Sequence, residues 1–458
     1  MWKWLLRLLG LNTSAPASTT PPRARAGAEN RGIAHAAAGG VSGIAATAPQ
    51  QATATLANPS AALALQVLRR PLLQQDGSLA GFEHSVAAAN LASAEAEGTA
   101  DRTAEARALL TAMGYTVTSG RRALAVLESA WLADPQVQAL IQPGMMFGLA
   151  DNPFQQARHE PLLSALKRQG AVLGSTGLPR ASAAFVVFDA AGLDRQGLLD
   201  RARACAAAAP SAQVVATGIR TLDDLEASLH GGYAMAAGLF DRVGTRRESG
   251  SLAPNVQRLC RLINRVMTDA DTGPIADEIR GDVGLTYRML RHANSPLLGL
   301  TRTVESVDQA LQLMGRQALY RWLTTLLVAS ATSRHTSVAL QEITLARARM
   351  MEQLAPSVGG PPAALFTTGL LSLLDVMLEV PMAEALAPLS LPPEAHAALV
   401  EQTGPWRPLI EVARCLESGQ NAQAEQHAQA LGGLDTVVPA MTEAWQWAAQ
   451  VTASLKQP

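Results

Sequence analysis

Apolar residues recur at intervals of three and four residues between positions 281 and 330, and this is the clearest pattern in the chain. Such spacing places apolar side chains on one face of a helix. Asp282 stands just ahead of the first run, in the position of an N-cap. This helix is predicted to end near Asn294. Asn294 and Ser295 are predicted to satisfy free carbonyl and amide groups at the turn that follows.

Two more helices are predicted after this turn. Ser306 is followed three residues later by Gln309, which is the spacing of a capping box. The helix that they begin is predicted to stop at Gly315, because glycine commonly ends helices. The next helix contains Trp322, whose face is predicted to be mostly core. A surface that receives a partner helix is the alternative.

The segment from residue 61 to 241 has a different pattern. Short apolar runs, clearest at 184–190, 213–218 and 233–240, alternate there with helical patterns. Strands that alternate with helices predict a parallel sheet or barrel. From residue 242 to 458 the pattern is helical only. The sequence therefore predicts an α/β domain followed by an all-α domain.

Residues 1–60 are predicted to form a disordered leader. Most of this stretch is rich in Ala, Thr, Ser, Pro and Gly, which cannot bury enough apolar surface to offset the entropy lost on ordering. Residues 1–11 differ, because Trp2 and Trp4 stand there among leucines. A short helix that contacts a membrane surface or a partner is the alternative to a frayed terminus.

Composition limits the classes of function. The net charge is −1 and 16% of the residues are charged, so the basic excess of a nucleic-acid-binding protein is absent. Cys205, Cys260 and Cys415 lie far apart without metal-binding spacing, which suits a reducing cytosol and predicts no metal site. The sequence contains no run of about eighteen apolar residues, so no membrane-spanning helix is expected. A cytoplasmic protein is expected.

The helical pattern carries a resemblance to a known family. DVGLTYRMLRHANSPLLGL at 282–300, followed by VESVDQALQLMGRQALYRWL at 304–323, resembles the HDOD domain, an all-helical relative of the HD phosphohydrolases. The resemblance continues through residues 366–386. The positions that match the family and are expected to serve structure or interaction are Asp282, Asn294, Ser295, Gly315 and Trp322.

The chemistry of the catalytic HD relatives is not expected here. Those enzymes bind metal through histidines and an adjacent His-Asp pair, and Ser372 and Leu373 stand where the pair would be, on a helix predicted over 367–375. Asp375 comes two residues late, on another part of the helix surface. A lone His335 is more readily explained as a hydrogen-bonded core or surface residue than as a ligand.

The α/β segment resembles a second family. LRRPLLQQDGSLAGFEHSV at 68–86 looks like the first hairpin of the EAL domain, the cyclic-di-GMP phosphodiesterase barrel. GAVLGSTG at 170–177, FVVFDAAGL at 185–193 and VVATGIRTLDDLEA at 214–227 stand where that family has later motifs. The segment holds about 180 residues against roughly 250 in a full (β/α)8 barrel, so the resemblance implies a shortened barrel.

The resemblance also implies a degenerate site. The family's chemistry needs carboxylates at the strand ends that hold divalent metals, together with a lysine and further glutamates. Glu83 keeps the first glutamate of the signature, and Asp189 survives. The residues that stand at the other motif positions cannot supply these groups, and they are Gly148, Gly174, Ser175, Val187, Thr217, Arg220 and Ala237.

Arg70 and Arg220 leave one binding function open. Beside Glu83, their guanidinium groups are candidates for bidentate contacts with the phosphates of cyclic di-GMP, and solvated or ion-paired arginines are the alternative. The sequence thus predicts a non-catalytic signalling or scaffold protein that acts through protein partners, without cofactor or metal. A cyclic-di-GMP receptor that does not hydrolyse the nucleotide is the first alternative, and an active phosphodiesterase is the second.

Overall fold

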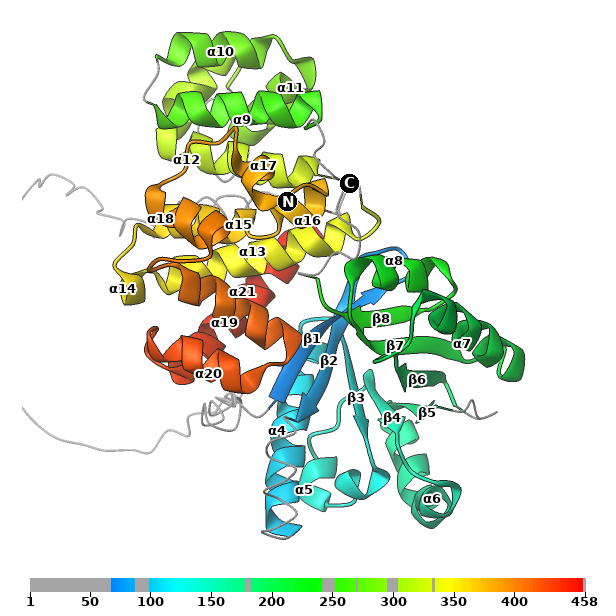
Figure 1. Cartoon of the computed structure of the whole chain (residues 1–458). Helices are drawn as coiled ribbons and strands as arrows, with labels where there is room; N and C mark the ends of the chain where they lie inside the picture. The colour runs from blue at the N-terminus through cyan, green and yellow to red at the C-terminus, as the bar shows by residue number, and fades with distance from the viewer. Residues whose placement is uncertain are drawn as a thin grey trace, which may run out of the picture.

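The computed structural model describes residues 67–86, 99–177, 183–240, 252–268, 271–294, 304–331 and 334–455. The predicted leader with Trp2 and Trp4, and also Ser295, lie outside these residues. A β-barrel with α-helices comes first, and a wholly helical part follows beside it (Figure 1). The predicted fold class, an α/β barrel followed by an all-α domain, is confirmed.

Eight strands close into a barrel in the order of the sequence. The first strand runs antiparallel to both of its neighbours, and all other neighbouring pairs are parallel. The strands are β1 (Val67–Gln74), β2 (Leu79–Val86), β3 (Arg122–Leu127), β4 (Met145–Leu149), β5 (Val172–Thr176), β6 (Phe185–Asp189), β7 (Gln213–Ile219) and β8 (Met235–Gly238).

The segment that forms the barrel has few residues, and one short connection contributes to this. Only eight residues separate β5 from β6, whereas parallel strands are usually joined by a dozen residues or more that include a helix. The helices that connect the other parallel strands are α4 (Thr99–Thr118), η1 (Ser129–Leu132) with α5 (Pro135–Gln138), α6 (Pro153–Arg168), α7 (Arg195–Ala208) and α8 (Leu222–His230).

Apolar side chains fill the interior of the barrel. Since side chains alternate between the two faces of a strand, every second residue points inward. The inward set packs as one buried cluster of Leu72, Leu124, Met146, Phe185, Val187, Val215, Met235 and Ala237. The barrel is therefore a packed core and not an open channel.

The second part contains no strand among the residues that the structure describes. Its helices are α9 (Pro254–Met267), α10 (Thr272–Arg280), α11 (Val283–Ala293), α12 (Val307–Ser330), α13 (Ser337–Gln353), α14 (Ala355–Val358), α15 (Pro362–Leu371), α16 (Leu374–Leu378), α17 (Met382–Leu386), α18 (Pro393–His396) with the π-helical turn η2 (Ala397–Glu401), α19 (Arg407–Ser418), α20 (Asn421–Gln429) and α21 (Leu434–Leu455).

Local signals in the sequence explain where these helices begin and break. The Asp282 carboxylate accepts a hydrogen bond from the backbone N–H of Leu285 and caps α11. Ser306 caps α12 in the same way. At Gly315 the backbone has φ 70° and ψ 169°, so α12 is broken at the predicted position. This φ lies in the left-handed region that favours glycine.

Two residues at the centre of the HDOD resemblance have structural contacts. The Asn294 side chain donates to the carbonyl of Val304 and accepts from its N–H, both at 2.6 Å, and so joins the end of α11 to the start of α12. Trp322 is buried, and its ring stacks on His292 with centroids 5.6 Å apart. Burial lowers the pKa of His292 to about 3, so this imidazole is neutral packing material.

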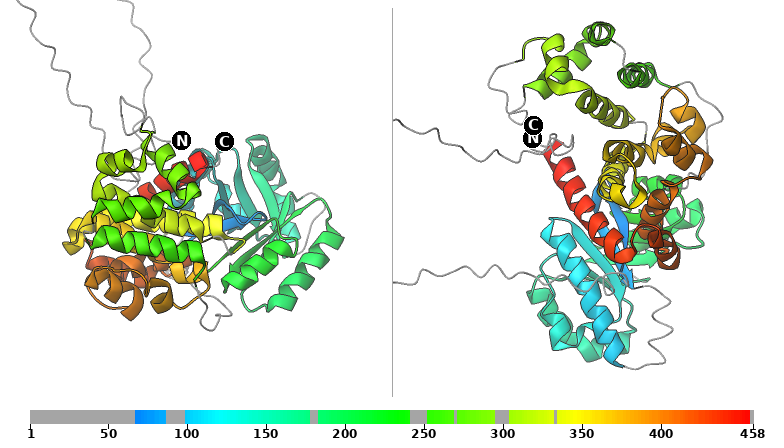
Figure 2. Two further views of the ribbon diagram at one scale, coloured as in Figure 1. Left: turned by 90° about the horizontal axis from the view of Figure 1, so that it is seen from above. Right: turned by 90° about the vertical axis from the view of Figure 1, so that its left-hand side faces the viewer.

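The helical part covers the outer face of the first hairpin. Trp445 of α21 meets Phe82 of β2 edge to face, with ring centroids 4.9 Å apart. Leu73 and Phe82 belong to the same continuous apolar cluster as the cores of α9 to α21. The views in Figure 2 show the two parts side by side, and α21 extends along the barrel. One hydrophobic core therefore spans both parts.

Candidate functional site

The resemblance to EAL domains directs attention to the end of the barrel at which the parallel strands finish. We call this end the barrel mouth. Its inward residues follow from the strand register, because Glu83 pairs with the interior residue Leu124, and Asp189 lies two residues after Val187. The inward set at the mouth is Glu83, Val126, Gly148, Gly174, Val187, Asp189, Thr217 and Ala237.

The structure brings Arg70 and Glu83 together. They are register partners on β1 and β2, and the Arg70 Nη1 lies 3.5 Å from the Glu83 Oε2. Burial raises the pKa of the Glu83 carboxyl, and nearby Asp189 raises it further, while Arg70 acts in the opposite direction. The inward set and its partner thus include two carboxylates, of Glu83 and Asp189, and one arginine, Arg70, which is already paired with Glu83.

The other arginine that was predicted to bind ligand is Arg220. It follows directly after β7, its side chain is exposed, and it forms no ion pair with Glu83 or with any other described carboxylate. Asp189 is also exposed, and its Oδ1 accepts a hydrogen bond from the backbone N–H of Ala191 at 2.9 Å. Phosphate binding by Arg70 and Arg220 therefore stays a prediction.

Apolar side chains occupy the space beside the two glycines of the mouth. A Cβ atom added at Gly148 would lie 2.5 Å from a methyl group of Val187. At Gly174 an added Cβ would lie between 2.5 and 2.6 Å from the Phe185 ring. Carboxylate or amide ligands at these positions would displace core residues. Glu83 and Asp189 alone do not provide the oxygen ligands of a two-metal site, so the residues of the mouth do not fit such a site.

The position that corresponds to the catalytic pair of the HD phosphohydrolases is occupied by a buried ion pair. The Arg347 guanidinium donates to the Ser372 hydroxyl at 3.2 Å and to both carboxylate oxygens of Glu417 at 3.0 and 2.6 Å. A fixed cation of the protein thus stands beside Ser372. The helix predicted over 367–375 is wrong in detail, because α15 ends at Leu371 and α16 begins at Leu374.

One group of metal-ligating side chains was not expected from the sequence. Glu411 and Cys415 lie one turn apart on α19, and His427 approaches them from α20, with the three ligand atoms within 4.8 Å of one another. Arg407 and Arg414 both bind the Glu411 carboxylate. These two cations oppose the binding of a metal ion there. Sequence spacing missed the group because it joins two helices.

A second polar region lies where the barrel meets the helical part, and we call it the junction. Arg334 is only 4% exposed, and its Nη1 contacts the carboxylates of Asp223 at 2.9 Å and Glu226 at 3.1 Å, both on α8. The Thr336 hydroxyl and N–H donate to Glu226 as well. More than a hundred residues separate these partners in the sequence, so no local signal predicts the contacts.

The turn of the first hairpin completes the junction. The His335 ring contacts the carbonyl oxygen of Gln75 at 2.8 Å and packs against His230, so His335 serves the junction and not a metal site with Asp375. A Cβ at Gly77 would lie 2.1 Å from the His335 carbonyl oxygen, so only glycine permits this approach.

One family model matches a part of the chain. Residues 250–386 match the family model of the HDOD domain. The chain thus carries an HDOD domain in its helical part, and the eight-stranded barrel ahead of it fits the EAL fold that the sequence predicted.

Particular relatives are more distant. The chain is 25% identical over 241 residues to the cyclic di-GMP phosphodiesterase CdgJ of Vibrio cholerae. This match covers 52% of this chain and 56% of CdgJ. It is 24% identical over 208 residues to the uncharacterized protein YuxH of Bacillus subtilis, and this match covers 44% of this chain and 51% of YuxH. The chain spans about half the length of the curated relatives it matches.

Among solved structures, the EAL domain of Xanthomonas citri FimX in complex with c-diGMP is 13% identical to this chain, with a TM-score of 0.30. That match covers 40% of this chain and 90% of the FimX chain.

Of the helices that the structure describes, none is both long enough and apolar enough to cross a membrane.

Proposed function

We propose that this chain is a non-catalytic, cytoplasmic signalling protein of a cyclic-di-GMP circuit, which acts through contacts with protein partners. The observation that carries the proposal is the apolar packing at the barrel mouth. Val187 and Phe185 fill the space in which side chains at Gly148 and Gly174 would have to lie. A barrel that worked as a metal-dependent phosphodiesterase would need oxygen ligands in that space.

The electrostatics of the mouth support the same proposal. Metal-assisted cleavage of a phosphodiester needs several anionic ligands that are free to coordinate cations. Glu83 is paired with Arg70, and burial raises the pKa of its carboxyl, which favours the protonated form. Asp189 alone then offers an exposed carboxylate. The assignment to a cyclic-di-GMP circuit rests on the similarity to CdgJ and on the fit of the barrel to the EAL fold.

A second candidate function is a receptor that binds cyclic di-GMP without cleaving it. One observation favours it, because the Arg70 side chain is 27% exposed and its buried Nε has no hydrogen-bond partner among the described residues. A phosphate oxygen would be a suitable acceptor for this group.

Calorimetric titration with cyclic di-GMP separates these functions. The full chain is titrated in the presence of Mg²⁺ and again with Mn²⁺, and each mixture is then analysed by chromatography for linear product. Our proposal predicts neither saturable heat nor product. Saturable binding without product, abolished by Arg70→Ala but not by the exposed control Arg203→Ala, would favour the receptor. Metal-dependent product would refute the non-catalytic assignment.

A further inference from the structure

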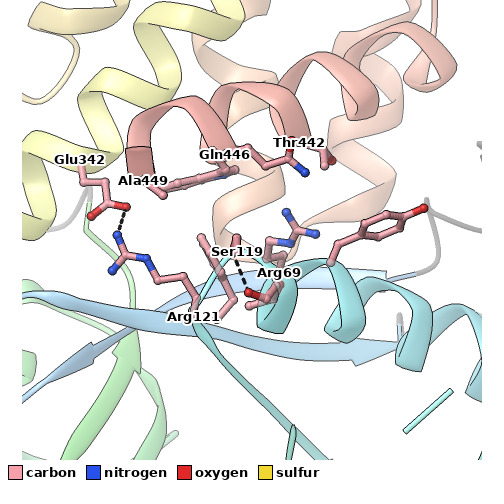
Figure 3. A pocket seen from close by; sticks show the side chains of 11 residues that line it. Arg69, Ser119, Arg121, Glu342, Thr442, Gln446 and Ala449 are labelled. Atoms are coloured by element: carbon pink, nitrogen blue, oxygen red, sulfur yellow. Dashed lines mark hydrogen bonds and ion pairs between the residues drawn. The ribbon is translucent and has the colours of Figure 1, made fainter. Parts of the chain in front are cut away.

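The helix α21 has one face that contacts the barrel. Trp445 packs there on the first hairpin, and Figure 3 shows Gln446 across a small cavity from Arg69. Arg121 and Glu342 also line this cavity and form an ion pair, drawn in Figure 3 as a dashed line. None of the side chains that line the cavity holds a buried polar atom without a hydrogen-bond partner.

Another face of α21 packs on the HDOD domain. Trp447 is 7% exposed there, and its ring meets Phe366 of α15 edge to face, with centroids 6.3 Å apart. The Cζ of Arg349, on α13, lies 5.9 Å from the centroid of the Trp447 ring. The Cζ of Arg321, on α12, lies 3.6 Å from the centroid of the Phe366 ring. The two carboxylate oxygens of Glu352 bind Arg321 at 2.6 Å and Arg349 at 3.0 Å. These five side chains form a closed circle of contacts, which we call the arginine cluster.

The arginine cluster contains donors that lack acceptors. The Nε and Nη2 of Arg321, the Nε of Arg349 and the Nε1 of Trp447 are buried, and none of them forms a hydrogen bond with a described residue. Gln353 follows Glu352 on α13, and its Oε1 is a buried acceptor in the same state. One amide oxygen cannot serve four nitrogen donors of three side chains. Since buried donors without acceptors cost free energy, what this region lacks is an acceptor.

A second buried arginine shows what Arg321 lacks. In Arg347 the Nε and Nη2 atoms form a fork that donates to the two carboxylate oxygens of Glu417, at 3.0 and 2.6 Å. Arg347 and Arg321 are buried to a similar extent, 3% and 4% exposed. Arg321 donates to Glu352 through Nη1, and no described residue accepts from its fork. Because anions are the usual partners of such a fork, Arg321 is suited to bind one.

The charges of the cluster favour an anion with a single charge. Two guanidinium groups share the Glu352 carboxylate, which is 12% exposed. Glu443 approaches Arg349 to 3.5 Å, but it is 61% exposed, so water screens this contact. Burial lowers the pKa of Arg321, Glu352 acts in the opposite direction, and Arg349 lowers the pKa further. One positive charge is thus left without an equally buried counter-charge, which is costly.

We propose that the arginine cluster binds one small monovalent anion, of the size of chloride or formate, at the fork of Arg321, with Arg349 and Trp447 as further donors. A divalent anion would bring more charge than the cluster offsets and would cost more to remove from water. The cluster joins α12, α13 and α15 of the HDOD domain to α21. The anion would therefore strengthen the docking of the helix that covers the first hairpin. This site lies outside the barrel, so the proposal does not rest on the function proposed above.

Thermal melting of the full chain in different sodium salts tests the proposal. The ionic strength is held at about 150 mM, so that screening of exposed charges stays constant. Gluconate, which is too large for a buried site, is replaced stepwise by chloride or by formate. With at least one of the two anions, the melting temperature should rise saturably by about 2 °C or more, because an ion that binds only the folded state stabilises it. A rise with chloride alone identifies a halide site, and a rise with formate alone identifies a carboxylate site.

Two variants locate the anion. Trp447→Phe removes the indole N–H but keeps an aromatic ring beside Phe366, and it should reduce the anion-dependent rise by about half or more. Arg321→Lys keeps the charge but removes the fork, and it should abolish the rise. Trp445→Phe is the matched control on the same helix. It should lower the melting temperature in every salt and leave the rise unchanged, because the Trp445 ring packs on Phe82 and not on the cluster.

Two results would overturn the proposal. The first is the absence of a rise in the wild type, which would mean that ordered water satisfies the donors of the cluster. The second is a rise that both Trp447→Phe and Arg321→Lys retain in full, which would mean that the anion binds elsewhere. If Arg321→Lys does not fold, Trp447→Phe decides alone.

Discussion

The barrel mouth and the junction differ in how many partners their polar side chains have. At the mouth, the structure places two carboxylates, one arginine and a set of apolar residues around Gly148 and Gly174. At the junction, Arg334 is almost fully buried and is held by carboxylates and by the carbonyl of Val376. The polar contacts with the most partners thus lie between the two parts and not at the strand ends.

This difference concerns where buried polar groups find partners. Polar groups taken out of water are retained only where their partners are also supplied, because an unpaired buried charge is costly. At the mouth the partners are few, and apolar packing replaces them. At the junction the Glu226 carboxylate accepts three hydrogen bonds, one from Arg334 and two from Thr336. These side chains therefore fix the barrel against the HDOD-containing part.

Arg334→Ala gives the largest effect that this comparison predicts. Removing the guanidinium leaves the Asp223 and Glu226 carboxylates without their buried cation, so the free energy of unfolding should fall by about 3–5 kcal/mol. Urea denaturation measures the loss. The exposed pair of Arg203 with Asp200 provides the control, and Arg203→Ala should leave the midpoint unchanged. A loss as small as that of the control would show that the junction is not firmly fixed.

The neighbours Glu83 and His84 on β2 sharpen the comparison, because they point to opposite faces of the strand. Glu83 faces the mouth, while His84 contacts the Thr116 hydroxyl of α4 at 3.1 Å. The folded protein holds the pKa of His84 near 3, below its ordinary value of 6.5. The folded state then binds fewer protons than the unfolded state, so stability is full above pH 6.5 and falls as the pH drops toward 3.

His84→Gln should remove this acid sensitivity. Relative to the variant, the wild type should lose about 1.4 kcal/mol for each pH unit below 6.5, and therefore about 2 kcal/mol at pH 5. Urea denaturation of both proteins at several pH values between 8 and 4.5 gives the difference. Parallel pH profiles for the two proteins would mean that His84 takes up a proton as readily in the folded state as in the unfolded state.

Glu83→Gln should give the smallest effect and the opposite sign of pH dependence. Because the folded protein raises the pKa of this carboxyl, ionised Glu83 lowers stability above pH 4.5. The contact with Arg70 is 3.5 Å long and leaves the Glu83 Oε2 without a hydrogen bond. At pH 7 the variant should therefore be more stable than the wild type by about 1 kcal/mol, the low end of the cost of an unsatisfied buried acceptor. Below pH 4.5 the difference should vanish. A marked loss of stability at pH 7 would show that the pair with Arg70 holds the mouth together.

Local features of the structure could be predicted from the sequence with few errors. Asp282, Ser306 and Gly315 act through backbone groups within a few residues, so their spacing carries the information. The strands were predicted for a similar reason, since alternation and motif order are properties of short segments. The prediction of one helix over 367–375 failed because tertiary contacts of Ser372 decide the break there.

The candidate sites were less predictable. Glu83 and Arg70 could be paired through the hairpin, because the turn fixes their register. Arg69 stands next to Arg70 in the sequence, yet it points to the other face and meets α21. Arg121 and Glu342 are 221 residues apart. Contacts of this kind depend on how two parts pack, and a single sequence holds no periodicity that reveals them.

The contact of Trp445 with Phe82 has a consequence for how such a chain can change. Domains that fold alone can be exchanged between proteins, because each takes its own core with it. Here the outer face of the first hairpin is covered by the last helix of the chain, and a single apolar cluster includes both. Separation would leave that face of the barrel exposed to water. Neither part therefore carries a complete core of its own, and a substitution on the shared face should affect the stability of both.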